Sequence, residues 1–238
     1  MPDVINAWEM TPEQYVKEFA RYRGWLGSLW TNYYQPCLYM ITRDGMTGRV
    51  VNRTHWILDN LARWAGDDLS LVAYCTRSLL ELVAILWSVD RTDEWQRFFA
   101  LAATDVADCA KMVMRLGIGP EEEGRQLLED LKQSYKQVEL AVPEDIQRAR
   151  TDAKNAGYLR EYDEAFKLLS KFVHPTPLVL FSPPTDADIL DTIRTYFFSK
   201  AVKYVHTIYC LAAEQSGYDP AELDLKGQLA QLRAELAQ

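Results

Sequence analysis

Apolar side chains recur every three or four positions along almost the whole chain, the spacing of one face of an α-helix. The first run follows the sequence TPEQ, 11–14, a capping box with proline at the first helical position, and Pro36 ends it. The glycine-containing segment 42–48 predicts a turn. A second helix is then expected around Val51, with Gly66 at its end.

The third predicted helix is apolar on most sides, so we expect it to be central. It is capped by Asp67 or Asp68 and runs to about Val89. It is long enough to cross a bilayer, but it contains Arg77 and Glu81, whose charges are costly near a membrane centre. We therefore interpret it as a buried helix and expect no membrane association.

The second half of the chain predicts further helices separated by proline and glycine. The expected features are an exposed helix or lid over 144–156, a helix ending in LLSKFVHPTP (168–177), a Pro-rich loop over 175–184, and a long helix to about Gln215. Leucines at coiled-coil-like spacing then predict an amphipathic helix over 221–237. With no convincing strand pair, the predicted fold is an all-α multi-helix bundle. We divide it into a bundle domain, 1–217, and a C-terminal helix, 218–238, that is docked or oligomerising.

Composition narrows the expected partners. The chain has 238 residues and a net charge of -8, with 26 basic against 34 acidic residues, and it has no basic run. We therefore expect no broad DNA-binding surface, although a local basic pocket for RNA or a nucleotide stays open. The N-terminus lacks a secretory signal pattern and the four cysteines are dispersed among apolar residues, so we expect a cytoplasmic protein.

Common catalytic motifs are absent from the sequence. It contains no phosphate-binding glycine loop, no dinucleotide fingerprint, no nucleophile elbow and no cysteine pair at zinc spacing. The residues three before the histidines are not the glutamates that a di-iron bundle needs. We therefore expect neither a cofactor nor a metal.

Two polar pairs remain as the candidate site, and each has i,i+4 spacing that puts its members on one helix face. Arg77 and Glu81 lie in the central helix, where buried charges need partners. Ser170 and His174 precede Pro175, which ends the helix and leaves the imidazole near a helix C-terminus, where the protonated form is favoured. We expect the four side chains to converge as a catalytic cluster. The competing interpretations are a surface ion pair and a helix-capping histidine.

The other two histidines are interpreted as structural. His55 lies in RVVNRTH, 49–55, and His206 lies in a helix rich in aromatic residues. Lone histidines on amphipathic helices more often pack or hydrogen-bond than catalyse.

The segments RSLLELVAILWSV and KLLSKFVHPTP resemble an uncharacterised bacterial family of all-helical proteins, a domain of unknown function with Arg-x-x-x-Glu and Ser-x-x-x-His-Pro motifs. The resemblance covers about 69–208. The chain also resembles, more distantly, the HEPN superfamily of helical RNases and nucleotide-associated toxins, which carry Arg four to six residues before His and cleave RNA without metal. Lys167 and Lys171, not Arg, precede His174; Arg49 and His55 have the HEPN spacing, but near the N-terminus.

Three functions follow as hypotheses. In the first, a HEPN-like protein acts on RNA or a nucleotide without metal, with His174 as acid or base, Arg77 as phosphate partner, Glu81 as orienting group and Ser170 as an added hydrogen bond. In the second, a non-enzymatic interaction or sensor module uses the cluster structurally and segment 221–237 as a contact surface, either for a protein partner or for a second copy of the chain. The third is a small-molecule pocket between helices.

Overall fold

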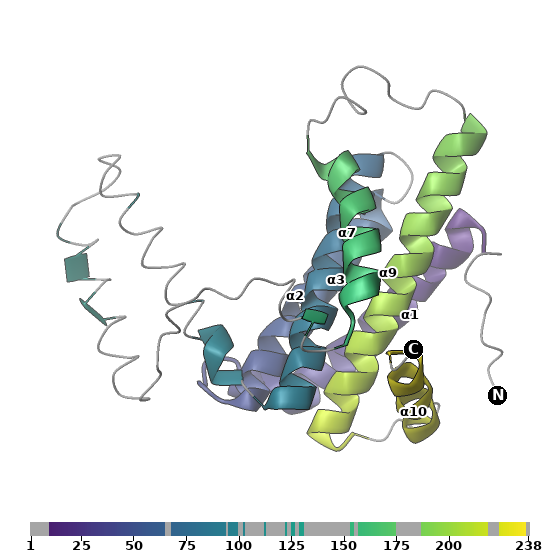
Figure 1. Ribbon diagram of the computed structural model, residues 1–238. Coiled ribbons are helices and arrows are strands. Elements are labelled where there is room, and N and C mark those ends of the chain that lie inside the picture. The colour runs from purple at the N-terminus through teal and green to yellow at the C-terminus, as the bar shows by residue number, and fades with distance from the viewer. Residues whose placement is uncertain are drawn as a thin grey trace.

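The described part of the chain is helical throughout. The computed structural model describes residues 10–64, 68–93, 95–99, 102, 112, 122, 125–126, 129–130, 153–154, 157–174, 187–218 and 224–236. Within these residues the elements are helices and no strand is present, so the predicted all-α multi-helix bundle is confirmed. Figure 1 shows the longer helices packed side by side.

Helix α1, Pro12–Leu29, begins as its sequence predicts. The Thr11 side chain accepts from the Gln14 backbone N–H and the Gln14 side chain accepts from the Thr11 N–H, which completes the capping box. The chain does not stop after Leu29, because a π-helical turn, Trp30–Tyr34, and a 3₁₀ turn, Gln35–Cys37, carry it to the region of Pro36.

The turn predicted at 42–48 is wrong, because helix α2, Arg43–Trp64, already begins there. Its early glycines permit close packing instead of a reversal. A Cβ on Gly45 would lie 2.1 Å from the Met40 carbonyl oxygen, and one on Gly48 would lie 3.1 Å from Cβ of Tyr34. The absent side chains let the helix approach the preceding backbone.

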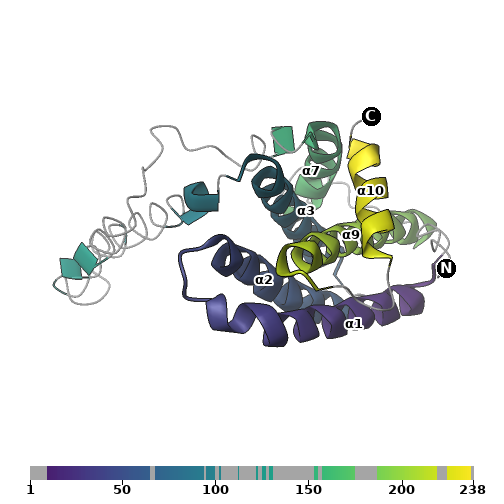
Figure 2. The ribbon, with the colours of Figure 1, turned by 90° about the horizontal axis from the view of Figure 1, so that it is seen from below.

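Helices α3, Leu69–Thr92, and α9, Ala187–Ser216, form the centre of the bundle and pack against each other. Figure 2 shows α1 and α2 on one side of this pair and α7, Leu159–Val173, on the other. Asp68 caps α3 by accepting from the Ser70 and Leu71 N–H groups. By length and composition α3 could cross a membrane, and half of its most apolar window is buried inside the bundle.

Helix α10, Leu225–Leu236, packs on α9. Leu225, Leu229 and Leu232 are buried, so the apolar side of α10 is used within the chain. Arg233 anchors the helix through Glu214 at 2.7 Å and Asp90 at 3.3 Å. In this chain the helix is docked.

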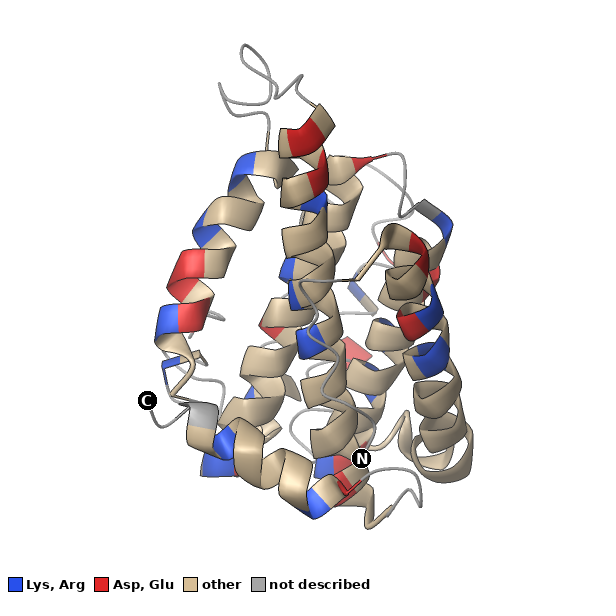
Figure 3. Cartoon of the chain, turned by 90° about the vertical axis from the view of Figure 1, so that its right-hand side faces the viewer, with Lys and Arg blue, Asp and Glu red and all other residues tan. Residues whose placement is uncertain are grey.

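Two expectations lie outside the described residues: the Pro-rich loop over 175–184 and most of the lid over 144–156. The described helix α10 begins after Asp224, whose Oδ1 accepts from the Gly227 N–H at 3.0 Å. Along the helices in Figure 3, basic and acidic positions are interspersed.

Candidate functional site

A groove runs along the side of α3 that the core does not cover. It has a volume of about 420 Å³ and lies between α2 and the end of α7. Positions three and four apart on α3 supply its floor, because such residues share one helix face. The lining residues are Arg53, Tyr74, Arg77, Ser78, Glu81, Leu82, Ile85, Val173 and His174.

Arg77 is the centre of the groove. Its Nε lies 3.3 Å from Oε1 of Glu81, and its Nη1 lies 3.1 Å from Nε2 of His174. Its Cζ also lies 4.2 Å from the ring centroid of Phe166, within range of a cation–π contact. Arg77 therefore joins α3 to α7 while its side chain stays 22% exposed.

His174 is placed by the end of α7. The helix ends at Val173, and His174 takes an extended conformation, φ −99° and ψ 154°, as the following proline favours. Because Arg has only donors, Nε2 of His174 is the acceptor, and the proton of the neutral ring lies on Nδ1.

Two opposing effects act on the pKa of the Glu81 carboxyl group. Burial raises its pKa above the ordinary value, and the charge and hydrogen bond of Arg77 offset part of that rise. Its side chain keeps 35% of its surface exposed, so water reaches the pair. The Arg77–Glu81 pair is therefore half-buried. It is intermediate between the two alternatives that the sequence leaves open, a buried cluster and a surface ion pair.

Ser170 does not join the cluster. Its Oγ is buried, has no hydrogen-bond partner in the described residues, and does not line the groove. Although the two residues have i,i+4 spacing, the His174 ring contacts Arg77, whereas the Ser170 hydroxyl is buried outside the groove lining. Thus Arg77, Glu81 and His174 come together and Ser170 does not.

Neither of the other two histidines lines the groove: His206 links helices, and His55 pairs within α2. His206 Nδ1 lies 3.0 Å from the Tyr22 hydroxyl and its Nε2 lies 3.2 Å from Oε1 of Gln228, which connects α9 to α1 and α10. His55 Nδ1 lies 3.9 Å from Asp59.

Arg49 and His55 have the HEPN-type spacing, but their side chains do not point toward each other. Positions six apart on a helix point about 120° away from each other. Arg49 donates instead to the carbonyls of Met40 and Gly45, each at 3.2 Å.

Sequence reasoning missed Arg53 and Tyr74 as groove residues. Arg53 Nη2 lies 3.5 Å from the Tyr74 hydroxyl, and its Cζ lies 4.2 Å from the ring centroid of Trp56. Tyr74 precedes Arg77 by three positions, so helical spacing could have placed it on the same face. No sequence signal joins Arg53, on α2, to this face of α3.

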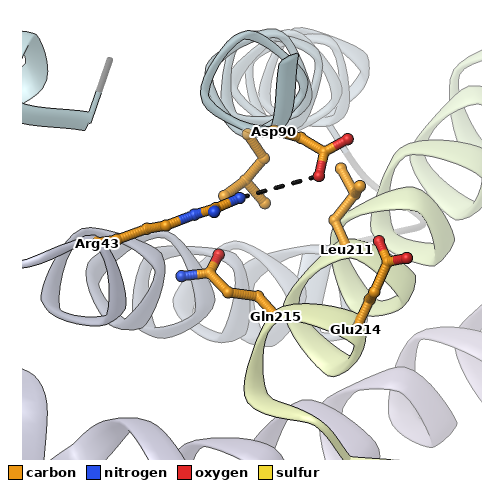
Figure 4. Close-up of a pocket in the computed structure, with 6 residues that line it drawn as sticks. Arg43, Asp90, Leu211, Glu214 and Gln215 are labelled. Carbon is orange, nitrogen blue, oxygen red and sulfur yellow. Dashed lines mark ion pairs between the residues drawn. The ribbon is translucent and has the colours of Figure 1, made fainter. Parts of the chain in front are cut away.

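A second, smaller cavity of about 230 Å³ lies where the ends of α2, α3 and α9 meet. Figure 4 shows Arg43 reaching toward Asp90, with Glu214 and Gln215 on the facing helix. Arg43 lies 3.9 Å from Asp90. Arg233 of α10 pairs with the carboxylates of Asp90 and Glu214. This network fastens helix ends and α10.

The described residues contain no group of three His, Cys, Asp or Glu side chains that could hold a metal ion. Burial raises the pKa of the Cys75 thiol and of the Cys210 thiol to about 12, so both are poor nucleophiles at neutral pH. Cys109 lies outside the described residues.

Comparison of the chain with protein-family models, curated proteins and solved structures found no match. The two family resemblances therefore remain predictions from sequence.

Proposed function

We propose that the protein binds a phosphate group of RNA or of a nucleotide in the α3 groove and cleaves the phosphodiester of RNA there, with His174 as the base. The observation that carries the proposal is the 3.1 Å contact between Nη1 of Arg77 and Nε2 of His174 in an open groove. A guanidinium can bind phosphate oxygens in a bidentate manner, and imidazole is the side chain whose proton exchange suits neutral pH.

Substrate binding would exchange the partner of Arg77. A phosphate oxygen beside Arg77 accepts the Nη1 hydrogen that His174 accepts in the free protein, which releases Nε2. The neutral ring then takes the proton of a ribose 2′-hydroxyl. The 2′ oxygen bonds to phosphorus, the bond from phosphorus to the 5′ oxygen breaks, and that oxygen leaves with a proton from solvent.

Two neighbours support Arg77 in this role. Glu81 binds its Nε, and Phe166 stacks under the guanidinium, so the Nη1 edge points toward His174. Arg53 lines the same groove and adds a second positive charge. Charge placed before the reaction stabilises the charge that develops on the phosphoryl oxygens.

The test is cleavage of a single-stranded RNA oligonucleotide in buffer containing EDTA, which suppresses contaminating metal-dependent nucleases. We expect His174→Ala to lower the rate by about 100-fold or more, in the range of lost acid–base catalysis. His55→Ala is the matched control, because it removes a partly exposed histidine outside the groove. A substrate with 2′-deoxyribose at the cleaved position should be inert. Equal rates for the natural protein and His174→Ala would overturn the proposal.

A non-enzymatic module is the second candidate, and the contacts of Arg77 favour it. Arg77 connects α3 to α7 through its contacts with Glu81, His174 and Phe166. Leu225, Leu229 and Leu232 of α10 are buried in the chain, so such a module needs a partner surface other than that side of 221–237. In this case His174→Ala lowers the melting temperature while no RNA is cleaved.

A further inference from the structure

Two exposed aromatic side chains are associated with the groove: Tyr74 lines it, and Trp56 contacts the lining residue Arg53. Trp56 on α2 is 47% exposed and Tyr74 on α3 is 40% exposed. The chain covers other tryptophans more fully than Trp56: Trp87 is 1% exposed, and Trp25 stacks on Tyr209 with ring centroids 5.3 Å apart. Large exposed rings next to a groove are typical of binding surfaces.

Arg53 joins the two rings to the groove. Its Cζ lies 4.2 Å from the Trp56 ring centroid, and its Nη2 lies 3.5 Å from the Tyr74 hydroxyl. Arg53 and Tyr74 both line the groove that contains Arg77. Tyr74 and Arg77 are three positions apart, about 4.5 Å along the helix axis. Aromatic surface and positive charge therefore alternate over a short distance.

This combination selects one ligand chemistry. Flat rings bind another flat ring by stacking, and guanidinium groups bind phosphate oxygens. A nucleotide carries both an unpaired base and a phosphate, whereas phosphoserine and phosphothreonine carry no ring. We propose that Trp56, Arg53 and Tyr74 form a stacking platform for the nucleobase attached to the phosphate that Arg77 binds. The inference rests on the phosphate site of the proposed function.

Stacking is tolerant of sequence because every base has a π-face, so the platform adds affinity for nucleotides in general. By alanine substitution, stacking of one base on an aromatic side chain contributes about 5- to 150-fold in affinity. Purines offer the larger ring surface, so adenosine monophosphate is the suitable probe.

The experiment measures binding of adenosine monophosphate and ribose 5-phosphate to the full chain by calorimetry. We expect adenosine monophosphate to bind about 10-fold more tightly, within the stacking range above. Trp56→Ala should abolish this difference without weakening ribose 5-phosphate, and Trp56→Phe should keep most of it. Tyr39→Ala, which removes an aromatic side chain that is 89% exposed, is the matched control and should change neither affinity. Unchanged thermal melting confirms that each variant folds.

Three results would overturn the platform. Equal affinity of the natural protein for the two ligands leaves the phosphate site standing without a base subsite. Tighter binding of a phosphotyrosine peptide than of the nucleotide, lost in Trp56→Ala, assigns the rings to a protein ligand. Binding of neither small ligand removes the platform and the phosphate site together. Conversely, Trp56-dependent nucleotide binding without His174-dependent RNA cleavage supports the platform and rejects the catalytic proposal.

Discussion

Replacing Arg77 by Met tests whether the groove cluster holds the bundle together. The change keeps an unbranched side chain of similar length but removes the charge and both hydrogen bonds, to Glu81 at 3.3 Å and to His174 at 3.1 Å. It also leaves Glu81 without its cationic partner in a place where burial raises the pKa of that carboxyl. The folded state should therefore lose stability at neutral pH.

The magnitude follows from the lost contacts. Hydrogen bonds that involve a charged group contribute about 1.5–3 kcal/mol each, and an exposed cation–π contact contributes about 0.5–1 kcal/mol. Water replaces part of this, because the two side chains of the ion pair are 22% and 35% exposed. Met also keeps apolar contact with Phe166. We expect a net loss of about 2 kcal/mol, which for a chain of this length lowers the melting temperature by about 4–8 °C.

The assay is thermal unfolding followed by circular dichroism at pH 7. Arg160→Met is the matched control: Arg160 and Glu164 have the same spacing, order and donor atom at 3.2 Å, but their side chains are 88% and 65% exposed. An exposed pair of this kind contributes only about 0.3–0.5 kcal/mol.

A double variant, Arg77→Met with Glu81→Leu, removes the unpaired carboxylate as well. It should recover at least half of the lost stability, because the cost of breaking a buried pair comes largely from the charge left behind. Equal melting temperatures for Arg77→Met and Arg160→Met would refute the reasoning and make the cluster an ordinary surface pair.

Three further predictions concern the rest of the bundle. Burial alone would raise the pKa of Glu161, but the ion pair with Lys200 at 2.7 Å lowers this pKa below the ordinary 4.5. Glu161→Gln should therefore lower the melting temperature at pH 7. The difference from the natural protein should shrink as pH falls below 4.5, because the carboxylate becomes protonated. Gly45→Ala should destabilise α2, because its Cβ would lie 2.1 Å from a carbonyl oxygen, whereas Gly24→Ala, with nothing within 4 Å, should stabilise α1 by about 0.5–1 kcal/mol. Leu229→Ala should cost about 2–5 kcal/mol while the mass from light scattering stays unchanged, because this side chain, 2% exposed, packs within the chain.

Each of these predictions has a contrary result. A difference for Glu161→Gln that grows at low pH would mean that the carboxylate is not stabilised by its partner. Equal effects at Gly45 and Gly24 would mean that the approach of α2 to the preceding backbone relaxes freely. A change in mass for Leu229→Ala would indicate that α10 contacts another copy.

Much of the fold could be predicted because helices are specified locally. The Thr11 capping box, the Asp68 cap and the end of α7 before Pro175 each act within four residues, and the structure has all three. The segment 42–48 fails for the opposite reason. A glycine can permit either a turn or a close approach of two backbone segments, and the sequence does not distinguish the two. Here the neighbouring backbone at Met40 decides for close approach.

The candidate site was likewise predictable only where it depends on local backbone geometry. Sequence alone determined that Arg77 and Glu81 share a helix face and that His174 ends a helix, since both depend on local backbone geometry. The tertiary structure decided that His174 contacts Arg77, that Ser170 stays outside the groove, and that Arg53 enters it from α2. These depend on how helices far apart in the chain pack against one another, because the angle and rotation of two helices follow from all the side chains between them.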